Sequence, residues 1–330
     1  MTSPASALLD VQHLTTVIQG DGWTAPAVDD VSFAIRPGEI LGIVGESGSG
    51  KSLTALSILR LLGAQVAIAG GSIRFEDRDL LHLSEEEMRR IRGAEISMIF
   101  QDPMTSLDGA FTIGAQLTET VRAHRRVSHA EAERQAIDMI DRVGISQPRR
   151  RLDAYPHEFS GGMRQRVMIA MALMLKPKLL LADEPSTALD VTTQAQIIEL
   201  ILELQREMGM SMILISHDLG VVLDVAERVA VMYAGHLVEV APSKAIFEAP
   251  LHPYTQGLLR SKLSLMSDEE YVKVIDGQIP GLRQRPAACR FAPRCPQAID
   301  VCSREVPPLL PVDSGDRWLR CFNPKPWVPA

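Results

Sequence analysis

Several features are scarce in this chain of 330 residues. Aromatic residues make up only 5% of it, and lysine occurs seven times against 27 arginines. The net charge is -7, which argues against a protein that coats DNA or RNA, because such proteins are normally basic. The longest apolar run, Val167–Leu175, has nine residues. That is far fewer than the roughly 20 that a membrane-spanning helix needs.

The start of the chain lacks the pattern of a targeting signal. Residues 1–11 contain neither the basic stretch nor the apolar stretch of a secretory leader. Apolar residues account for 46% of the chain and charged residues for 23%, which is ordinary globular usage. We therefore expect a folded protein of the cytosol, and the length alone favours about two domains of roughly 150 residues each.

Cysteine is scarce and unevenly distributed. All four cysteines lie in the last 42 residues, at Cys289, Cys295, Cys302 and Cys321. Proteins of the cytosol seldom use disulfides, so such a cluster favours a metal site over crosslinks. From about residue 261 proline and arginine also become more frequent and clear hydrophobic periodicity ends. These changes predict a small module that is held together by something other than an apolar core.

Hydrophobic patterning before that module predicts short strands and helices. Apolar or alternating segments at 8–18 and 28–35 are typical of strands, and the Gly, Asp and Pro residues within 20–26 indicate a turn region. A buried strand is predicted over 39–44, followed by a helix over 51–62.

The middle of the chain is predicted to be helical. A strand over 96–100 precedes it, and Ser128 and Glu131 have the spacing of a capping box. From 178 to about 234 strands alternate with helices, the pattern of a parallel sheet. We therefore expect an α/β core split into 8–103 and 178–260, a helical insert over 104–177, and the Cys-rich module over 261–330.

The most specific motif lies between the strand at 39–44 and the helix at 51–62. Residues 45–52 match G-x-x-x-x-G-K-[ST], in which glycines let backbone N–H groups turn inward around an anion. The helix that follows presents its positive end to phosphates. Lys51 would reach the β- and γ-phosphates and Ser52 would bind Mg²⁺. The motif predicts nucleotide binding by Gly45, Glu46, Ser47, Gly48, Ser49, Gly50, Lys51 and Ser52.

Two carboxylates follow a second buried strand, 179–182. Successive side chains on a strand point to opposite faces, so Asp183 and Glu184 can take separate roles. Asp183 would hold Mg²⁺ through water, and Glu184 would act as general base toward the attacking water. A solvated turn is the alternative for an Asp-Glu pair, and the phosphate loop favours the catalytic interpretation.

A second candidate anion site opens the apolar helix that runs to about residue 175. Ser160 is a good N-cap, and Gly161 and Gly162 expose the first N–H groups of the helix. Taken alone, the pattern is more typical of an ordinary capped helix. Two anion sites for one triphosphate are reconciled if a nucleotide lies between two copies of the chain, arranged head to tail.

The order of these motifs over residues 8–260 resembles the nucleotide-binding subunit of ATP-binding-cassette (ABC) transporters. That resemblance implies a P-loop NTPase (RecA-like) cassette of the α/β class with an antiparallel β subdomain, ATP and Mg²⁺ as its ligands, and a helical subdomain. The segments that carry it are 45–52, Gln101, Ser160 to Gln165, Asp183-Glu184, Ser186 to Asp190 and His217.

The resemblance also implies roles that spacing alone does not establish. Gln101 would sense the γ-phosphate and Mg²⁺ and report to membrane subunits, and His217 would contact the γ-phosphate. Residues of the Ser160 to Gln165 motif, with Asp190 at the dimer interface, would act on the ATP of the opposite subunit. The nucleotide-binding residues implied in this way are Ser160, Gly161, Gly162, Gln165 and Asp190.

One position departs from the family pattern. The family usually stacks an aromatic side chain from the first strand region on the adenine ring, and the register places Ile18 there. Trp23, in a nearby Gly-rich loop, could substitute by shifting the stack. A loop residue without a nucleotide role is the alternative for Trp23.

The cysteine spacing, C-x₅-C-x₆-C-x₁₈-C, lacks the tight C-x₂₋₄-C knuckle of most zinc sites. Four thiolates with wider gaps suit a [4Fe–4S] cluster better, and zinc or no metal are the alternatives. The segments 252–256, 279–281 and 289–296 resemble the ABC subunits for dipeptides and oligopeptides, a branch whose members carry an iron–sulfur cluster here. We expect a structural cluster, with redox sensing as the alternative. Four nearby arginines could offset its charge, and we favour a solvated basic surface for them: Arg283, Arg285, Arg290 and Arg294.

The resemblance implies an ATPase on the cytoplasmic face of the inner membrane that powers import of di- or oligopeptides. Its implied partners are a second ABC ATPase (a distinct paralogue), two transmembrane permease subunits and, through the complex, a periplasmic or lipid-anchored peptide-binding protein, with no nucleic acid. The alternatives are another substrate of the branch (nickel, glutathione or an antimicrobial peptide), an ABC ATPase outside transport, a P-loop kinase or GTPase, and a redox regulator built on the cysteines.

Overall fold

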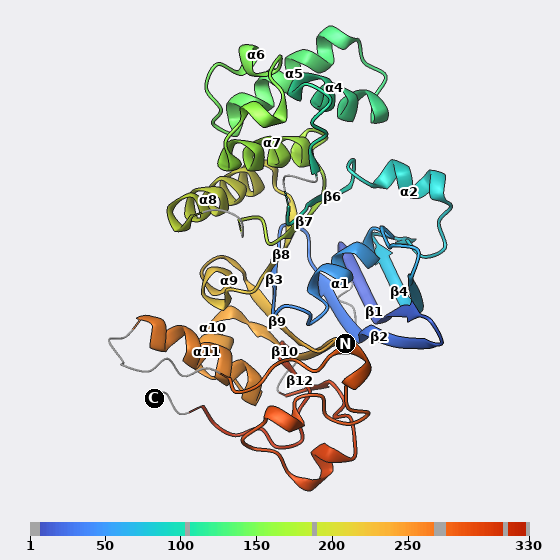
Figure 1. Ribbon diagram of the computed structural model, residues 1–330, viewed down its shortest axis with the longest axis vertical. Helices are drawn as coiled ribbons and strands as arrows, with labels where there is room; N and C mark the ends of the chain where they lie inside the picture. Colours follow the sequence, from blue (N-terminus) through green and yellow to red (C-terminus); the bar gives the residue numbers. More distant parts are fainter. Residues whose placement is uncertain (1–6, 103–105, 187–189, 267–274, 313–315, 328–330) are drawn as a thin grey trace. The chain divides into compact units, whose positions relative to one another are not determined.

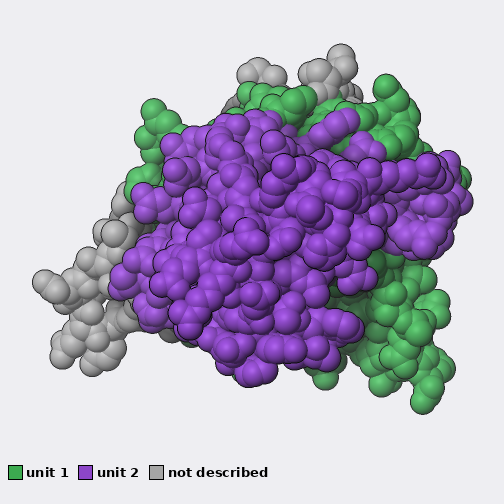
Figure 2. Space-filling view, turned by 90° about the horizontal axis from the view of Figure 1, so that it is seen from above, with its two compact units in different colours: residues 1–82, 214–330 green, residues 83–213 purple. Residues whose placement is uncertain are grey.

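The computed structural model describes residues 7–102, 106–186, 190–266, 275–312 and 316–327. The chain forms two compact units, which Figure 2 distinguishes by colour. Unit 1 contains residues 1–82 and 214–330, and unit 2 contains residues 83–213. Strand β8 (Ser211–Ser216) crosses from one unit into the other.

The first sheet of unit 1 is antiparallel, with the order β2-β1-β4-β5. Its strands are β1 (Leu9–Gly20), β2 (Trp23–Ile35), β4 (Val66–Phe75) and β5 (Arg78–Asp79). The strands predicted over 8–18 and 28–35 are confirmed, but β2 begins five residues earlier than predicted. Pro26 is tolerated within it because β2 is the edge strand, where a missing N–H costs no ladder hydrogen bond. The turn between the two strands therefore shrinks to residues 21–22.

The second sheet of unit 1 is mixed. Its strands that lie wholly in unit 1 have the order β11-β12-β10-β9-β3, and β3 pairs parallel with β9 while the other neighbours among these five are antiparallel. All five residues of β3 are buried, as predicted for an apolar run in this class of fold. The strands are β3 (Ile40–Val44), β9 (Arg228–Tyr233), β10 (His236–Pro242), β11 (Leu310–Pro311) and β12 (Trp318–Leu319).

Among the described residues of unit 1, the helices are α1 (Lys51–Ile58), α9 (Leu219–Val225), α10 (Ser243–Glu248) and α11 (Pro253–Met266). Helix α1 ends earlier than the predicted 51–62. Arg60 adopts a φ of 53° just beyond it, a left-handed conformation that terminates helices. The Arg60 guanidinium donates to the Leu80 carbonyl oxygen at 3.0 Å, which links the end of the helix to the segment after β5.

Unit 2 pairs β6 (Ile96–Ile99) with β7 (Leu179–Asp183) in parallel. Its helices are α2 (Glu85–Ile91), α4 (Ile113–His124), α5 (His129–Arg142), α6 (Pro148–Arg151), α7 (Gly161–Leu173) and α8 (Val191–Met208), with the 3₁₀ turn η1 (Pro156–Glu158). Helices α4, α5 and α7 pack against one another (Figure 1). We call residues 113–173 the helical segment.

Amphipathic periodicity builds the helical segment. In α5 the buried residues are Ala132, Ala136, Met139 and Ile140, which share one face at three- and four-residue spacing. The Ser128 half of the predicted capping box is confirmed, since the N–H of Glu131 donates to the Ser128 hydroxyl at 3.2 Å. The Glu131 carboxylate itself pairs with residues further along the same helix.

The described residues after α11, which are 275–312 and 316–327, form the C-terminal module. It contains the 3₁₀ turns η2 (Leu282–Gln284), η3 (Ala292–Arg294) and η4 (Asp300–Ser303) and the short strands β11 and β12. Among these described residues the buried apolar ones are few: Ala288, Phe291, Cys302, Pro307 and Leu319. Apolar burial within these described residues is therefore small.

Candidate nucleotide-binding and hydrolysis site

The predicted phosphate loop lies in unit 1, between the end of β3 and the start of α1. Gly45 leaves no room for a side chain, because a Cβ atom there would lie 2.1 Å from the Met232 carbonyl oxygen. Gly50 precedes α1 with a φ of 110°, a conformation that L side chains rarely adopt. Backbone geometry therefore requires glycine at both positions.

Lys51 folds back over this loop. It is only 5% exposed, and its Nζ donates to the carbonyl oxygens of Gly45 (2.7 Å) and Glu46 (3.2 Å). Ser52 follows it in the first turn of α1. The lysine thus places a positive charge beside the N-terminal end of a helix, where backbone N–H groups already favour an anion.

The predicted catalytic carboxylates lie in unit 2, at the end of β7. Asp183 is buried, with 3% of its surface exposed, and Glu184 is half-buried. The structure brings Gln101 to Glu184: the Gln101 amide nitrogen donates to a Glu184 carboxylate oxygen at 3.4 Å. Glu184 has a φ of 46°, and a non-glycine residue in this region carries about 1–3 kcal/mol of strain.

The predicted second anion site also lies in unit 2. Ser160 caps α7, since its hydroxyl accepts the Met163 N–H at 3.3 Å. Gly162 packs close to α8, where an added Cβ would lie 3.2 Å from the Thr193 methyl group. Gln165 is 2% exposed and its amide donates to the Pro185 carbonyl oxygen, so this side chain ties α7 to the residue after Glu184.

Asp190 is the N-cap of α8. Its carboxylate accepts the Thr193 N–H at 3.0 Å and the Thr193 hydroxyl at 2.8 Å, and these hydrogen bonds lower the pKa of the Asp190 carboxyl. Ser186 is described, whereas Thr187, Ala188 and Leu189 of the same predicted motif lie outside the described residues.

His217 belongs to unit 1 and follows β8 directly. It is exposed. The next residue, Asp218, caps α9 by accepting the Gly220 N–H at 2.8 Å and pairs with Lys262 at 3.3 Å. The backbone that carries His217 is therefore anchored on its C-terminal side by a helix cap and an ion pair.

The two candidates for adenine stacking lie on neighbouring strands. Ile18 pairs with Ala25 across the β1–β2 hairpin. Trp23 lies over Gly20, where an added Cβ would come within 2.3 Å of the indole ring. The Arg283 guanidinium stands 5.6 Å from the centre of the same ring. Trp23 is thus positioned by a glycine on β1 and a cation from the C-terminal module.

The surroundings of Glu46 involve residues outside the sequence motifs. Its carboxylate pairs with Arg294 at 3.0 and 3.1 Å, and its N–H donates to the Tyr254 hydroxyl at 2.9 Å. These partners come from the C-terminal module and from α11. Pairs separated by more than 200 residues in the sequence leave no local pattern, so no signal in the sequence could have revealed them.

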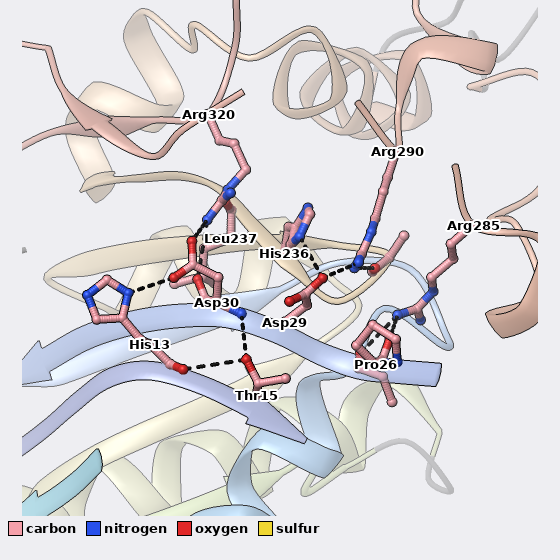
Figure 3. Close-up of polar contacts among 12 residues, drawn as sticks. His13, Thr15, Pro26, Asp29, Asp30, His236, Leu237, Arg285, Arg290 and Arg320 are labelled. Carbon is pink, nitrogen blue, oxygen red and sulfur yellow. Dashed lines mark hydrogen bonds and ion pairs between the residues drawn. The ribbon is translucent and has the colours of Figure 1, made fainter. Parts of the chain in front are cut away.

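The expectation of a solvated basic surface was wrong for three of the four arginines. Arg285 is half-buried and donates to the Pro26 (2.8 Å) and Ala27 (3.1 Å) carbonyl oxygens, and burial lowers its pKa to about 10. Arg290 is buried and contacts Asp29, and the Arg294 side chain is 7% exposed. Figure 3 shows Arg285 and Arg290 extending from the C-terminal module toward β2. Only Arg283 is exposed.

The four cysteines are free thiols within the C-terminal module. Burial raises the pKa of the Cys289 and Cys295 thiols and raises that of Cys321 to about 11, and the neighbouring cysteines add to each shift. The Cys289 N–H donates to the Cys302 carbonyl oxygen at 3.1 Å. Among the described residues, however, no group of three or more His, Cys, Asp or Glu residues could hold a metal ion. The predicted iron–sulfur site is therefore not supported by this geometry.

An apolar groove of about 400 Å³ opens on unit 2. Phe100, next to Gln101, lines it and is 39% exposed. The remaining lining comes from β6, α4, α7 and the segment before α4: Ser97, Met98, Ser106, Thr120, Met168, Met171 and Ala172. None of the described helices is both long enough and apolar enough to cross a membrane.

Comparison with known proteins agrees with this geometry. The family described as "ABC transporter" matches residues 28–187, and the family described as "Oligopeptide/dipeptide transporter, C-terminal region" matches residues 238–302. The Dipeptide transport ATP-binding protein DppD of Escherichia coli is 47% identical over 318 residues, covering 96% of this chain and 97% of that protein. DppD of Shigella flexneri matches to the same extent.

A solved structure resembles the chain as well. It is the dimeric, post-hydrolysis state of the ATP-binding cassette MJ0796 bound to ADP and Pi. The TM-score is 0.64 at 26% identity, and the match covers 71% of this chain and 98% of that one. The chain therefore belongs to the ABC transporter family as an ATP-binding subunit with ATPase function, and it carries the C-terminal region of the oligopeptide/dipeptide transporters. The predicted P-loop NTPase fold is confirmed.

Proposed function

We propose that this chain hydrolyses ATP to power the import of di- or oligopeptides through partner permease subunits. The observation that carries this proposal is the combination of a phosphate loop built on Gly45, Lys51 and Gly50 with a C-terminal region matched by the oligopeptide/dipeptide family. Relatives named for dipeptide transport align over nearly the whole chain.

In this proposal a small number of side chains and loop N–H groups bind and hydrolyse ATP. The loop N–H groups and Lys51 bind the phosphates, and Ser52, Gln101 and Asp183 would be the ligands of Mg²⁺, whose charge would offset that of the phosphates. Glu184 orients and deprotonates the attacking water, and the contact between Gln101 and Glu184 at 3.4 Å supports joint action of these two side chains. His217 contacts the γ-phosphate. Trp23, held by Gly20 and Arg283, stacks on adenine in place of Ile18.

A second ABC ATPase subunit completes the site. Ser160, Gly161, Gly162, Gln165 and Asp190 act on the nucleotide of that partner, which is a related but distinct chain. Support comes from the capped N-terminus of α7 and from the dimeric cassette with ADP and Pi. ATP closes the two cassettes, and hydrolysis lets them reopen, so that ATP occupancy biases the membrane subunits between two states.

The apolar groove beside Gln101 is the proposed contact with the two permease subunits. An exposed phenylalanine in a groove of about 400 Å³ is the type of surface that buries a partner's apolar side chain. In this proposal the chain lies on the cytoplasmic face of the inner membrane, and a periplasmic or lipid-anchored binding protein lies on the other side of the complex. Within the chain, we assign the ATPase core to residues 8–103 and 178–260. The helical subdomain is assigned to 104–177 and the Cys-rich C-terminal region to 261–330.

Hydrolysis is tested with Glu184→Gln, which keeps the shape of the side chain and removes the base. We expect ATP hydrolysis to fall by at least about 100-fold, because a positioned general base contributes that much, while ATP binding persists and ATP drives dimerisation in light scattering. The matched control is Glu199→Gln, an exposed position on α8. Undiminished hydrolysis in Glu184→Gln would remove Glu184 from this role.

Substrate is tested in proteoliposomes that contain the chain, its mate ATPase and the permease subunits. We expect dipeptide-loaded binding protein to stimulate ATP hydrolysis and to deliver labelled dipeptide into the lumen. Nickel, glutathione and an antimicrobial peptide serve as competitors, and stimulation by one of them alone would reassign the substrate. Co-purification with no membrane protein would favour an ABC ATPase outside transport.

We further propose that the four cysteines hold a [4Fe–4S] cluster with a structural role. Four cysteine thiolates are the usual ligand set of such clusters, and the hydrogen bond from the Cys289 N–H to the Cys302 carbonyl oxygen at 3.1 Å supports the proximity of two of them. When bound, the cluster would supply four bonds that hold a module with few buried apolar residues. Anaerobically purified protein should then be brown, with iron and acid-labile sulfide in equal amounts. A colourless protein with stoichiometric zinc would contradict it.

A further inference from the structure

The C-terminal module and α11 contact the phosphate loop at three points, all within unit 1. Arg294 donates to both carboxylate oxygens of Glu46, the second residue of the loop. The Tyr254 hydroxyl accepts the Glu46 N–H at 2.9 Å. Arg285 donates to the Gly48 carbonyl oxygen at 3.3 Å. One side chain, one backbone N–H and one backbone carbonyl oxygen of the loop are thus hydrogen-bonded to residues outside the motif.

Arg294 is rigidly oriented by its own module. Its remaining donors reach the carbonyl oxygens of Asp276 (2.8 Å), Gly277 (3.1 Å) and Ile275 (3.2 Å). A planar guanidinium with its donors bound in this way cannot turn without breaking several hydrogen bonds. The contact with Glu46 therefore exists only while residues 275–277 and 294 are folded together.

Tyr254 is held equally firmly. It is fully buried, and its ring packs edge-on against Tyr233 at 4.7 Å and lies 5.4 Å from the Phe291 ring. Because its hydroxyl accepts the Glu46 N–H, that N–H is turned toward α11. This contact fixes the direction in which the loop leaves β3.

Electrostatics give the Arg294 contact a second effect. Glu46 places a carboxylate within a loop built to bind a polyanion, and like charges repel most strongly where water is scarce. The charge-assisted pair with Arg294 offsets that carboxylate. A loop that is already ordered and neutralised also binds its ligand more tightly, because less freedom is lost on binding.

We propose that Arg294 and Tyr254 are positioning residues for the phosphate loop, and that the folded C-terminal module and α11 together thereby set the affinity of this subunit for nucleoside triphosphates. The inference rests on the proposed binding of ATP by the loop. It assigns the module a role in nucleotide affinity in addition to any role of its cysteines.

The test measures equilibrium binding of fluorescent trinitrophenyl-ATP with Mg²⁺ to the full chain, alongside thermal unfolding without nucleotide. Arg294→Gln should weaken binding about 10-fold, which corresponds to about 1.4 kcal/mol. Adding Glu46→Gln to that variant should restore binding to within about threefold of the wild type, because the uncompensated carboxylate is then gone. Tyr254→Phe, which removes one oxygen atom, should weaken binding about threefold.

The matched control is Arg304→Gln, in the same module but exposed and paired only locally with Asp300, which should bind as the wild type does. A purely structural role for Arg294 would not be rescued by Glu46→Gln, so failure of that rescue overturns the proposal, as does unchanged binding in Arg294→Gln and Tyr254→Phe. If the Arg294→Gln variant does not fold, nucleotide binding by the Tyr254→Phe variant alone tests the proposal. Failure of the wild type to bind the probe would instead overturn the proposed function.

Discussion

The helical segment and the C-terminal module are held together in different ways. In the helical segment, apolar residues such as Ile113, Leu117, Val121 and Ile140 are fully buried at helical spacing. In the C-terminal module, arginines replace them. The difference teaches that a segment can be anchored by polar groups that carry no periodic pattern, provided other parts of the fold offer enough acceptors.

Arginine suits this task because it carries five donors in a fixed fork. Arg320 is one such residue in the module. It donates to the carbonyl oxygens of Leu237 (3.1 Å), Pro307 (3.2 Å) and Asp30 (3.2 Å), and to the Asp30 carboxylate at 2.8 Å. Figure 3 shows the Arg320 side chain extending to Asp30 on β2.

The largest effect on stability is expected in the helical segment, which apolar burial holds together. Ile140→Ala removes a fully buried side chain from α5 and should destabilise unit 2 by about 2–5 kcal/mol, through lost burial and the cavity left behind. Hydrogen exchange by mass spectrometry should show the loss in α4, α5 and α7. Ile140→Val is the control, at about 1 kcal/mol. Equal effects of both variants would contradict a closely packed core.

A slightly smaller effect is expected at Arg320. Arg320→Met keeps the apolar stem but leaves several buried acceptors unpaired, which should cost about 2–3 kcal/mol. Limited proteolysis and hydrogen exchange should report local opening of residues 305–312 and 316–320. Arg320→Lys keeps the charge but not the fork, so it should recover less than half of the loss. Full recovery by lysine would show that charge rather than geometry anchors the module.

Helix caps offer a finer test of the helical segment. Ser128→Ala removes the acceptor for the Glu131 N–H at the start of α5 and should cost about 1 kcal/mol of unfolding free energy. Ser128→Asp supplies another good cap and should be close to neutral. Chemical denaturation followed by circular dichroism measures both. A cost for Ser128→Asp as large as that for Ser128→Ala would argue against capping as the cause.

The smallest effect on stability is expected at an arginine whose ion pair is local. Arg304 is 70% exposed and pairs with Asp300 one helical turn away. Arg304→Gln should change the unfolding free energy by less than about 0.5 kcal/mol, because exposed pairs contribute little. A loss comparable to that of Arg320→Met would mean that arginine content, rather than burial of the guanidinium, stabilises the module.

Contiguous motifs were predictable and distant contacts were not. The loop from Gly45 to Ser52 and the cap at Ser160 follow from local backbone chemistry, and the structure contains both. Pro26 within β2 was not foreseen, because an edge strand is defined only by the absence of a neighbour. Arg294 was assigned to a solvated surface, because its partner Glu46 lies 248 residues away.

By itself the sequence determined the class of fold, the phosphate loop, the carboxylates at Asp183 and Glu184, and the family. These features depend on short-range rules: glycine at strained positions, alternation on strands, and helix caps. Only the tertiary structure decided that Gln101 meets Glu184 and that Arg294 and Tyr254 hold Glu46. Such contacts join residues far apart in the chain, and hydrogen-bond geometry between them exists only after the strands and turns that carry them have packed.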